Sequence, residues 1–78
     1  MIRFRLKEVI ADYEFKHNRN LTLAELAQAT GIARGTLSKI ANEKGASVLT
    51  SNIDQLCGFF GCRVEDLMSY LPDDDAGK

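Results

Sequence analysis

Residues 21–45 read LTLAELAQATGIARGTLSKIANEKG and hold two short amphipathic patterns separated by a glycine. Thr22 and Glu25 fit a capping box. In this motif the Thr22 hydroxyl accepts a hydrogen bond from the backbone N–H three residues later, and the Glu25 carboxylate accepts one from the backbone N–H of Thr22. A helix is therefore expected to start here. It should stop at Gly31, because glycine readily takes the left-handed conformation that ends a helix.

The second pattern, ARGTLSKIAN, predicts a helix that begins at Ala33 or Arg34 and reaches Asn42. Its apolar residues recur at helical spacing, so they can bury one face. Two helices joined by a tight turn form a helix-turn-helix, which we predict for residues 22–42. The residues expected to anchor both helices to the core are Ile32, Leu37 and Ile40.

The opposite face of the second helix is polar or small. Its outward positions are Arg34, Gly35, Ser38 and Lys39, with Thr36 at the edge. Such a face can enter the DNA major groove, about 12 Å wide, where Arg or Lys donates to guanine and Ser or Thr pairs with several bases. Asn42, Lys44 and the first turn of the preceding helix are suited to phosphate contacts. The alternative is a helix that only exposes polar residues to solvent.

At the N-terminus, IRFRL puts Ile2 and Phe4 on one side and Arg3 on the other, a pattern typical of a short strand. Helical spacing takes over at Leu6 and is expected to end near His17. A lone strand needs a partner. A second copy of the chain in a two-fold dimer can supply it through Ile2, Arg3 and Phe4. The alternative is that the first helix simply extends to the N-terminus.

The C-terminal part is expected to hold two more helices. Thr50 or Ser51 can cap the fourth, which Gly61 closes, and a fifth spans residues 64–71 before Pro72 stops it. The remaining DDDAGK is too polar to fold alone. We therefore expect one all-α domain over residues 1–71, which begins with either the short β-strand or an extension of the first helix, and an acidic disordered tail over residues 72–78.

Charge is divided unevenly along the 78 residues. The net charge of −1 argues weakly against nucleic-acid binding, since proteins that bind nucleic acids usually carry an excess of basic residues. Residues 1–47, however, carry eight Lys and Arg against five acids, whereas residues 48–78 carry two against six. The basic half contains the predicted helix-turn-helix.

Several other classes of function lack the residues they need. Cys57 and Cys62 have the wrong spacing for zinc, and His17 is the only histidine, so we expect reduced structural thiols and no metal. No catalytic triad or phosphate-binding glycine loop can be assembled, so we expect no enzyme and no cofactor. No signal peptide or membrane span is evident, which predicts a cytoplasmic protein.

The stretch LTLAELAQATGIARGTLSKIANEKG resembles the helix-turn-helix of the Cro/phage-repressor type, the XRE family. The following VLTSNIDQLCGFFGCRVEDLMSYLP resembles the fourth and fifth helices of a small stand-alone branch of that family. The resemblance covers nearly the whole chain. It implies a five-helix, lambda-repressor-like domain that binds operator DNA, often as a dimer on a palindromic site.

The resemblance also implies roles for individual residues. Base-reading positions fall on Arg34, Gly35, Thr36 and Lys39, with Ser38 adjacent, and phosphate-contact positions fall on Thr22, Leu23, Asn42 and Lys44. Two positions depart from the family pattern. Leu23 stands where Gln is frequent, which leaves only a backbone contact to phosphate, and Ala33 replaces a capping Ser or Thr, at a cost of about 1 kcal/mol.

These observations predict a noncatalytic regulator of transcription, acting as a repressor, that reads double-stranded DNA with residues 34–42. The alternative is an antitoxin-like or adaptor module that uses the same helices to bind a protein partner.

Overall fold

The computed structural model describes residues 1–43 and 45–72, and the predicted contact Lys44 and the predicted tail beyond Pro72 lie outside them. Five helices and two short strands follow one another in these described residues. They are β1 (Ile2–Phe4), α1 (Leu6–His17), α2 (Leu23–Thr30), α3 (Arg34–Asn42), α4 (Thr50–Phe60), α5 (Val64–Leu67) and β2 (Met68–Tyr70). The expected five-helix architecture is confirmed.

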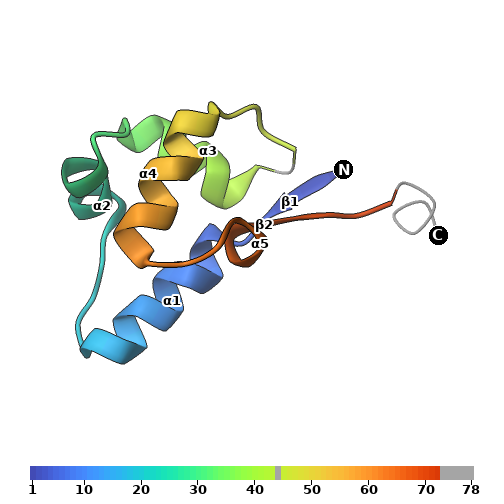
Figure 1. The fold of residues 1–78 in the computed structure, drawn as a ribbon. Helices are drawn as coiled ribbons and strands as arrows, with labels where there is room; N and C mark the ends of the chain where they lie inside the picture. The colour runs from blue at the N-terminus through green and yellow to red at the C-terminus, as the bar shows by residue number, and fades with distance from the viewer. Residues whose placement is uncertain (44, 73–78) are drawn as a thin grey trace.

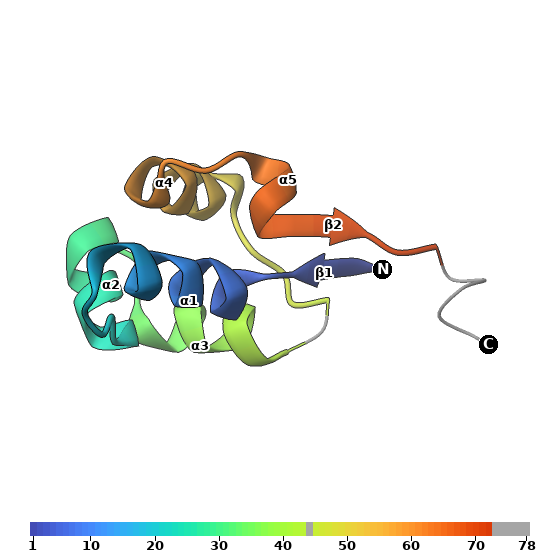
Figure 2. The ribbon, with the colours of Figure 1, turned by 90° about the horizontal axis from the view of Figure 1, so that it is seen from below.

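The helices form two groups around a small apolar core. In Figure 2, α4 and α5 lie on one side of α1, and α3 lies on the other side. α2 contacts both α3 and α4, which ties the two groups together. The buried core draws on every helix and on the connections before α2 and α3: Leu6, Leu21, Leu26, Ile32, Leu37, Ile40, Ile53, Leu56 and Leu67.

The predicted helix boundaries in the N-terminal half are confirmed. α1 begins where the period-2 pattern changes at Leu6, and it ends at His17, followed by Asn18 in the left-handed conformation with φ 51°. The backbone N–H of Leu21 then donates to the Glu14 carboxylate at 2.8 Å. This bond fixes how the chain enters α2.

The predicted cap of α4 is wrong. The N-cap is Leu49, and neither Thr50 nor Ser51 caps the helix, because Thr50 already has helical conformation. The Leu49 carbonyl accepts bonds from the N–H groups of Asn52 at 3.0 Å and Ile53 at 3.3 Å. Gly61 closes α4 as predicted.

The prediction of a fifth helix over residues 64–71 is also wrong in its second half. α5 stops after one turn at Leu67, and the next three residues form β2, antiparallel to β1. The register pairs Ile2 with Tyr70 and Phe4 with Met68. Backbone bonds close both ends of the pair, from Arg5 N to Leu67 O at 2.7 Å and from Leu71 N to Met1 O at 2.8 Å.

The N-terminal strand was therefore predicted correctly, but its partner was not. A strand of the same chain pairs with one edge of β1, so β1 does not need a second copy to become part of a sheet. The two-stranded sheet projects beyond the helices, and the described ends of the chain lie on this side of the molecule (Figure 1).

Candidate nucleic-acid interface

The turn between α2 and α3 is held by one buried hydroxyl. Thr30 Oγ1 donates to the Leu26 carbonyl at 2.7 Å and accepts from the N–H of Ile32 at 3.3 Å. Gly31 between them has φ 77°, the left-handed conformation that favours glycine. Sequence reasoning identified Gly31 but missed Thr30, which fixes the backbone on both sides of the glycine.

The N-terminus of α2 carries the predicted capping box. Glu25 N donates to Thr22 Oγ1 at 3.1 Å, and Thr22 N donates to the Glu25 carboxylate at 3.2 Å. Arg19 also donates to this carboxylate, at 3.2 Å. The backbone bond from Thr22 and then the Arg19 guanidinium hold the pKa of Glu25 below its ordinary value. The N–H groups of Leu23 and Ala24 have no partner within the helix, as at any helix start.

α3 begins at Arg34 without a side-chain cap, since Ala33 occupies the N-cap. Leu37 and Ile40 bury its inner face as predicted. On the outer face Arg34, Gly35 and Lys39 are exposed, whereas Thr36 and Ser38 are half-buried. The helix is thus anchored on one side and open on the other.

A shallow groove joins the start of α2 to the first two turns of α3. It is lined by Thr22, Leu23, Ala24, Arg34, Gly35 and Ser38. Five of these residues were singled out from the sequence, and Ala24 was missed although it directly follows the predicted cap and first helical residue. At Gly35, an added Cβ would meet nothing within 4 Å. No packing among residues 1–43 and 45–72 therefore requires glycine at that position.

The other predicted contacts on α3 lie outside this groove. Lys39 is exposed further along the helix, and Thr36 is half-buried. Asn42 is exposed, but its amide nitrogen donates to the Ser38 carbonyl at 3.0 Å and to the Ser38 hydroxyl at 3.3 Å. Its side-chain donors are therefore occupied inside the helix.

The cations on this surface are not neutralised within the described part of the chain. No ion pair within residues 1–43 and 45–72 involves Arg34 or Lys39, although Arg3, Arg19 and Arg63 each pair with a glutamate. Arg34 stands at the N-terminus of α3 and lines the groove beside the start of α2, and an uncompensated cation in that position attracts phosphate.

The described residues outside this surface offer little other chemistry. No group of three or more His, Cys, Asp and Glu residues among them can hold a metal ion. Burial, followed by the neighbouring Cys57 thiol, raises the pKa of the Cys62 thiol to about 11. No helix in residues 1–43 or 45–72 is both long and apolar enough to cross a membrane.

Comparison with known proteins assigns this arrangement to a family. The model of the Cro/C1-type HTH DNA-binding domain matches residues 5–73. The chain belongs to the Cro/C1-type HTH family. The resemblance seen in residues 21–45 is thereby confirmed, and DNA is the partner of the Cro/C1-type domain that includes α2 and α3.

A curated relative of this Cro/C1-type chain supports the same conclusion. It is an uncharacterized HTH-type transcriptional regulator, YozG, from Bacillus subtilis (strain 168), 29% identical over 59 residues. The matched region covers 76% of this chain and 70% of the relative. No solved structure matches the chain significantly.

Proposed function

We propose that the chain recognises specific sites in double-stranded DNA with α3 and represses transcription by occupying them. The observation that carries this proposal is the groove that joins the α2 N-terminus to the first turns of α3. Arg34 in this groove and Lys39 further along α3 are exposed and form no ion pair within the described residues. A helix with side chains is about 10–12 Å across, which matches a major groove of about 12 Å.

Base reading is assigned to α3. Arg34 and Lys39 donate to guanine edges, and Thr36 and Ser38 contact neighbouring bases. Gly35 reads nothing itself, but its lack of a side chain lets the backbone approach the DNA. Open space around Gly35 supports this assignment, because glycine is not needed there for packing.

Phosphate contacts are assigned to the start of α2 and to the residues that follow α3. Thr22 and the unpartnered N–H of Leu23 hold one phosphate, and Lys44 holds another. For Asn42 the bonds to Ser38 support a different role. It orients the Ser38 hydroxyl toward the bases, and a direct phosphate contact would require those bonds to break.

We further propose a homodimer that uses the apolar face of the β1–β2 sheet. Paired residues on neighbouring strands share a face, so Ile2, Phe4, Met68 and Tyr70 lie together. Phe4 and Met68 pack against the core, but Tyr70 is 66% exposed at the projecting end. Arg3 points to the opposite face and pairs with Glu8 at 3.1 Å, so it is a poor interface residue.

A two-fold axis through this patch would present two α3 helices to two half-sites of a palindrome. The proposed DNA-binding unit spans residues 1–71, followed by an acidic tail that adds solubility. The protein acts noncatalytically in the cytoplasm.

The test is selection of bound sequences from a random DNA pool, followed by fluorescence polarisation at a stated salt concentration. We expect a palindromic consensus and binding at least about 1,000-fold tighter than to unrelated DNA. A folded protein that shows no preference in the pool would contradict the proposal. If the folded protein shows no DNA preference and co-purifies with one stable protein partner, the result would favour the alternative of an antitoxin-like or adaptor module.

A further inference from the structure

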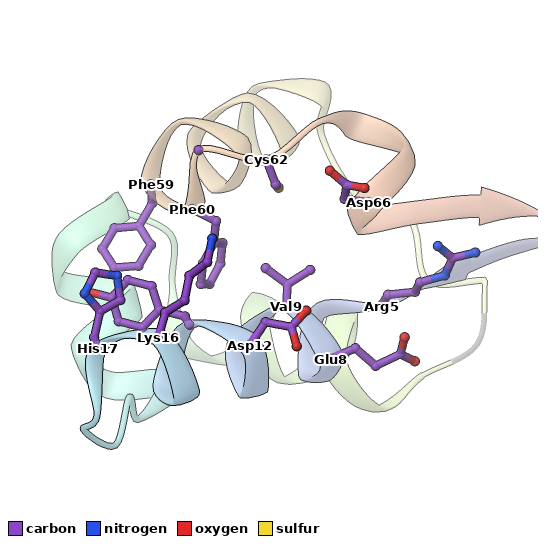
Figure 3. Close-up of a pocket in the computed structure, with 12 residues that line it drawn as sticks. Arg5, Glu8, Val9, Asp12, Lys16, His17, Phe59, Phe60, Cys62 and Asp66 are labelled. Carbon is purple, nitrogen blue, oxygen red and sulfur yellow. The ribbon is translucent and has the colours of Figure 1, made fainter.

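A second groove lies away from α3, between α1 and the segment that joins α4 to α5 (Figure 3). This groove is open to solvent and has a volume of about 700 Å³, within the range of about 300–1,000 Å³ that small-molecule sites occupy. None of its lining residues belongs to α2 or α3. A ligand bound here would therefore leave the proposed DNA-contacting residues uncovered.

One end of this groove is aromatic. The rings of Tyr13, Phe59 and Phe60 contact one another with centroids 5.0 to 5.8 Å apart, two of the three pairs edge-on. His17 stacks on Tyr13 at 4.2 Å. Phe59 and Phe60 are only half-buried, so part of the cluster remains open to the groove. An aromatic ring of a ligand can add to such a cluster by offset or edge-to-face contact.

Most charged groups at the other end are already engaged. Arg3 bonds to Glu8, and the Asp66 carboxylate accepts the N–H of Arg63 at 3.0 Å. Arg5 donates to the Glu65 carbonyl at 3.4 Å. These groups shape the rim but have a partner inside the chain.

Asp12 and Lys16 are different. Neither side chain forms a hydrogen bond or ion pair with another of the described residues, and both side chains rise from α1 at the groove (Figure 3). They are four residues apart, which is about one helical turn of 5.4 Å. The groove thus offers one carboxylate and one ammonium group, both on exposed residues, and Lys16 points toward the aromatic end (Figure 3).

We propose that this groove binds a free amino acid with an aromatic side chain. The ammonium group of the ligand bonds to Asp12, its carboxylate bonds to Lys16, and its ring packs against Phe60. This complementarity requires both charges on one small molecule, so a ligand with only one of them satisfies half of the site.

The test is titration of the ¹⁵N-labelled protein with L-phenylalanine, followed by the amide resonances of Val9, Tyr13 and Phe60. Phenethylamine and phenylacetate serve as matched probes, because each keeps the ring and one of the two charges. Saturable shifts with a dissociation constant of about 1 mM or lower are expected for phenylalanine, and binding about threefold weaker for each analogue.

Two charge-neutralising variants assign the contacts. Asp12→Asn should weaken phenylalanine binding about threefold and leave phenylacetate binding unchanged. Lys16→Gln should also weaken phenylalanine binding about threefold, but it should leave phenethylamine binding unchanged. Lys7→Gln and Asp54→Asn are the controls, since both positions are exposed and neither lines the groove. The proposal is overturned if phenylalanine gives no saturable shifts up to about 10 mM, if the shifts lie on α3, or if all three probes bind alike.

Discussion

Asn42 is tied to Ser38 one turn earlier in α3, through bonds of 3.0 Å to its carbonyl and 3.3 Å to its hydroxyl. If this link orients Ser38 for base reading, Asn42→Ala should change preference at the base pair that Ser38 contacts. We expect a loss of about 1 kcal/mol on the preferred site and a smaller loss on sites altered at that pair. Fluorescence polarisation with the selected DNA site and its single-base variants measures both losses of affinity. An equal loss on every sequence would instead identify Asn42 as a phosphate contact.

The anchoring of α3 predicts a sharp contrast between two neighbouring positions. Leu37 is fully buried, so Leu37→Ala should lower the free energy of unfolding by about 2–5 kcal/mol. Lys39 is exposed, and Lys39→Ala should change this free energy by no more than about 0.5 kcal/mol. Urea denaturation followed by circular dichroism gives both values. Similar losses in the two variants would show that the faces of α3 are misassigned.

The capping box makes part of the stability depend on pH. The pKa of Glu25 is lowered in the folded state, so its ionised form stabilises the fold above its unfolded pKa, and this contribution disappears as pH falls through the folded value. Glu25→Gln should therefore lower Tm at neutral pH, with a difference that shrinks below about pH 4.

Thr22→Ala is the matched control for that experiment. It removes a hydroxyl that does not titrate, so a loss of about 1 kcal/mol should persist at acidic pH. Thermal melts followed by circular dichroism at a series of pH values compare the two variants. A Tm difference for Glu25→Gln that is independent of pH would contradict the assigned role of the carboxylate.

The proposed dimer depends on the outer end of the β1–β2 sheet. Tyr70→Glu places a charge on the exposed apolar face without removing a backbone bond, so it should shift the mass in solution from dimer to monomer. Sedimentation equilibrium measures the mass. Glu65→Ala, at an exposed position of α5, is the control and should remain dimeric. An unchanged mass for Tyr70→Glu would refute this interface.

Local signals in the sequence were sufficient for the helix-turn-helix. The capping box at Thr22 and Glu25 and the left-handed Gly31 depend on residues within a few positions of each other, and each appears in the structure as predicted. The inner face of α3 was equally readable, because Leu37 and Ile40 recur at helical spacing. Arg34, Lys39 and the other predicted contacts follow from that face, although their roles toward DNA stay predictions.

The errors arise where distant residues decide the structure. Met68 and Leu71 continue the apolar helical spacing of Val64 and Leu67. Nothing nearby indicates that β1, more than 60 residues earlier, pairs with residues 68–70. The bonds between Asn42 and Ser38 were missed for a different reason, because these two residues are only one helical turn apart. The two residues suit either a phosphate contact or an internal bond, and only the side-chain positions distinguish these.

The measurement that tests the central claim most directly is the affinity of Lys39→Ala and Arg34→Ala for the selected site and for every single-base variant of it. If α3 reads the major groove, each variant loses about 1–3 kcal/mol on the preferred site and becomes indifferent to the base at one position per half-site. If each variant instead loses the same affinity on every sequence, these residues contact only phosphates, and α3 is not the reading helix.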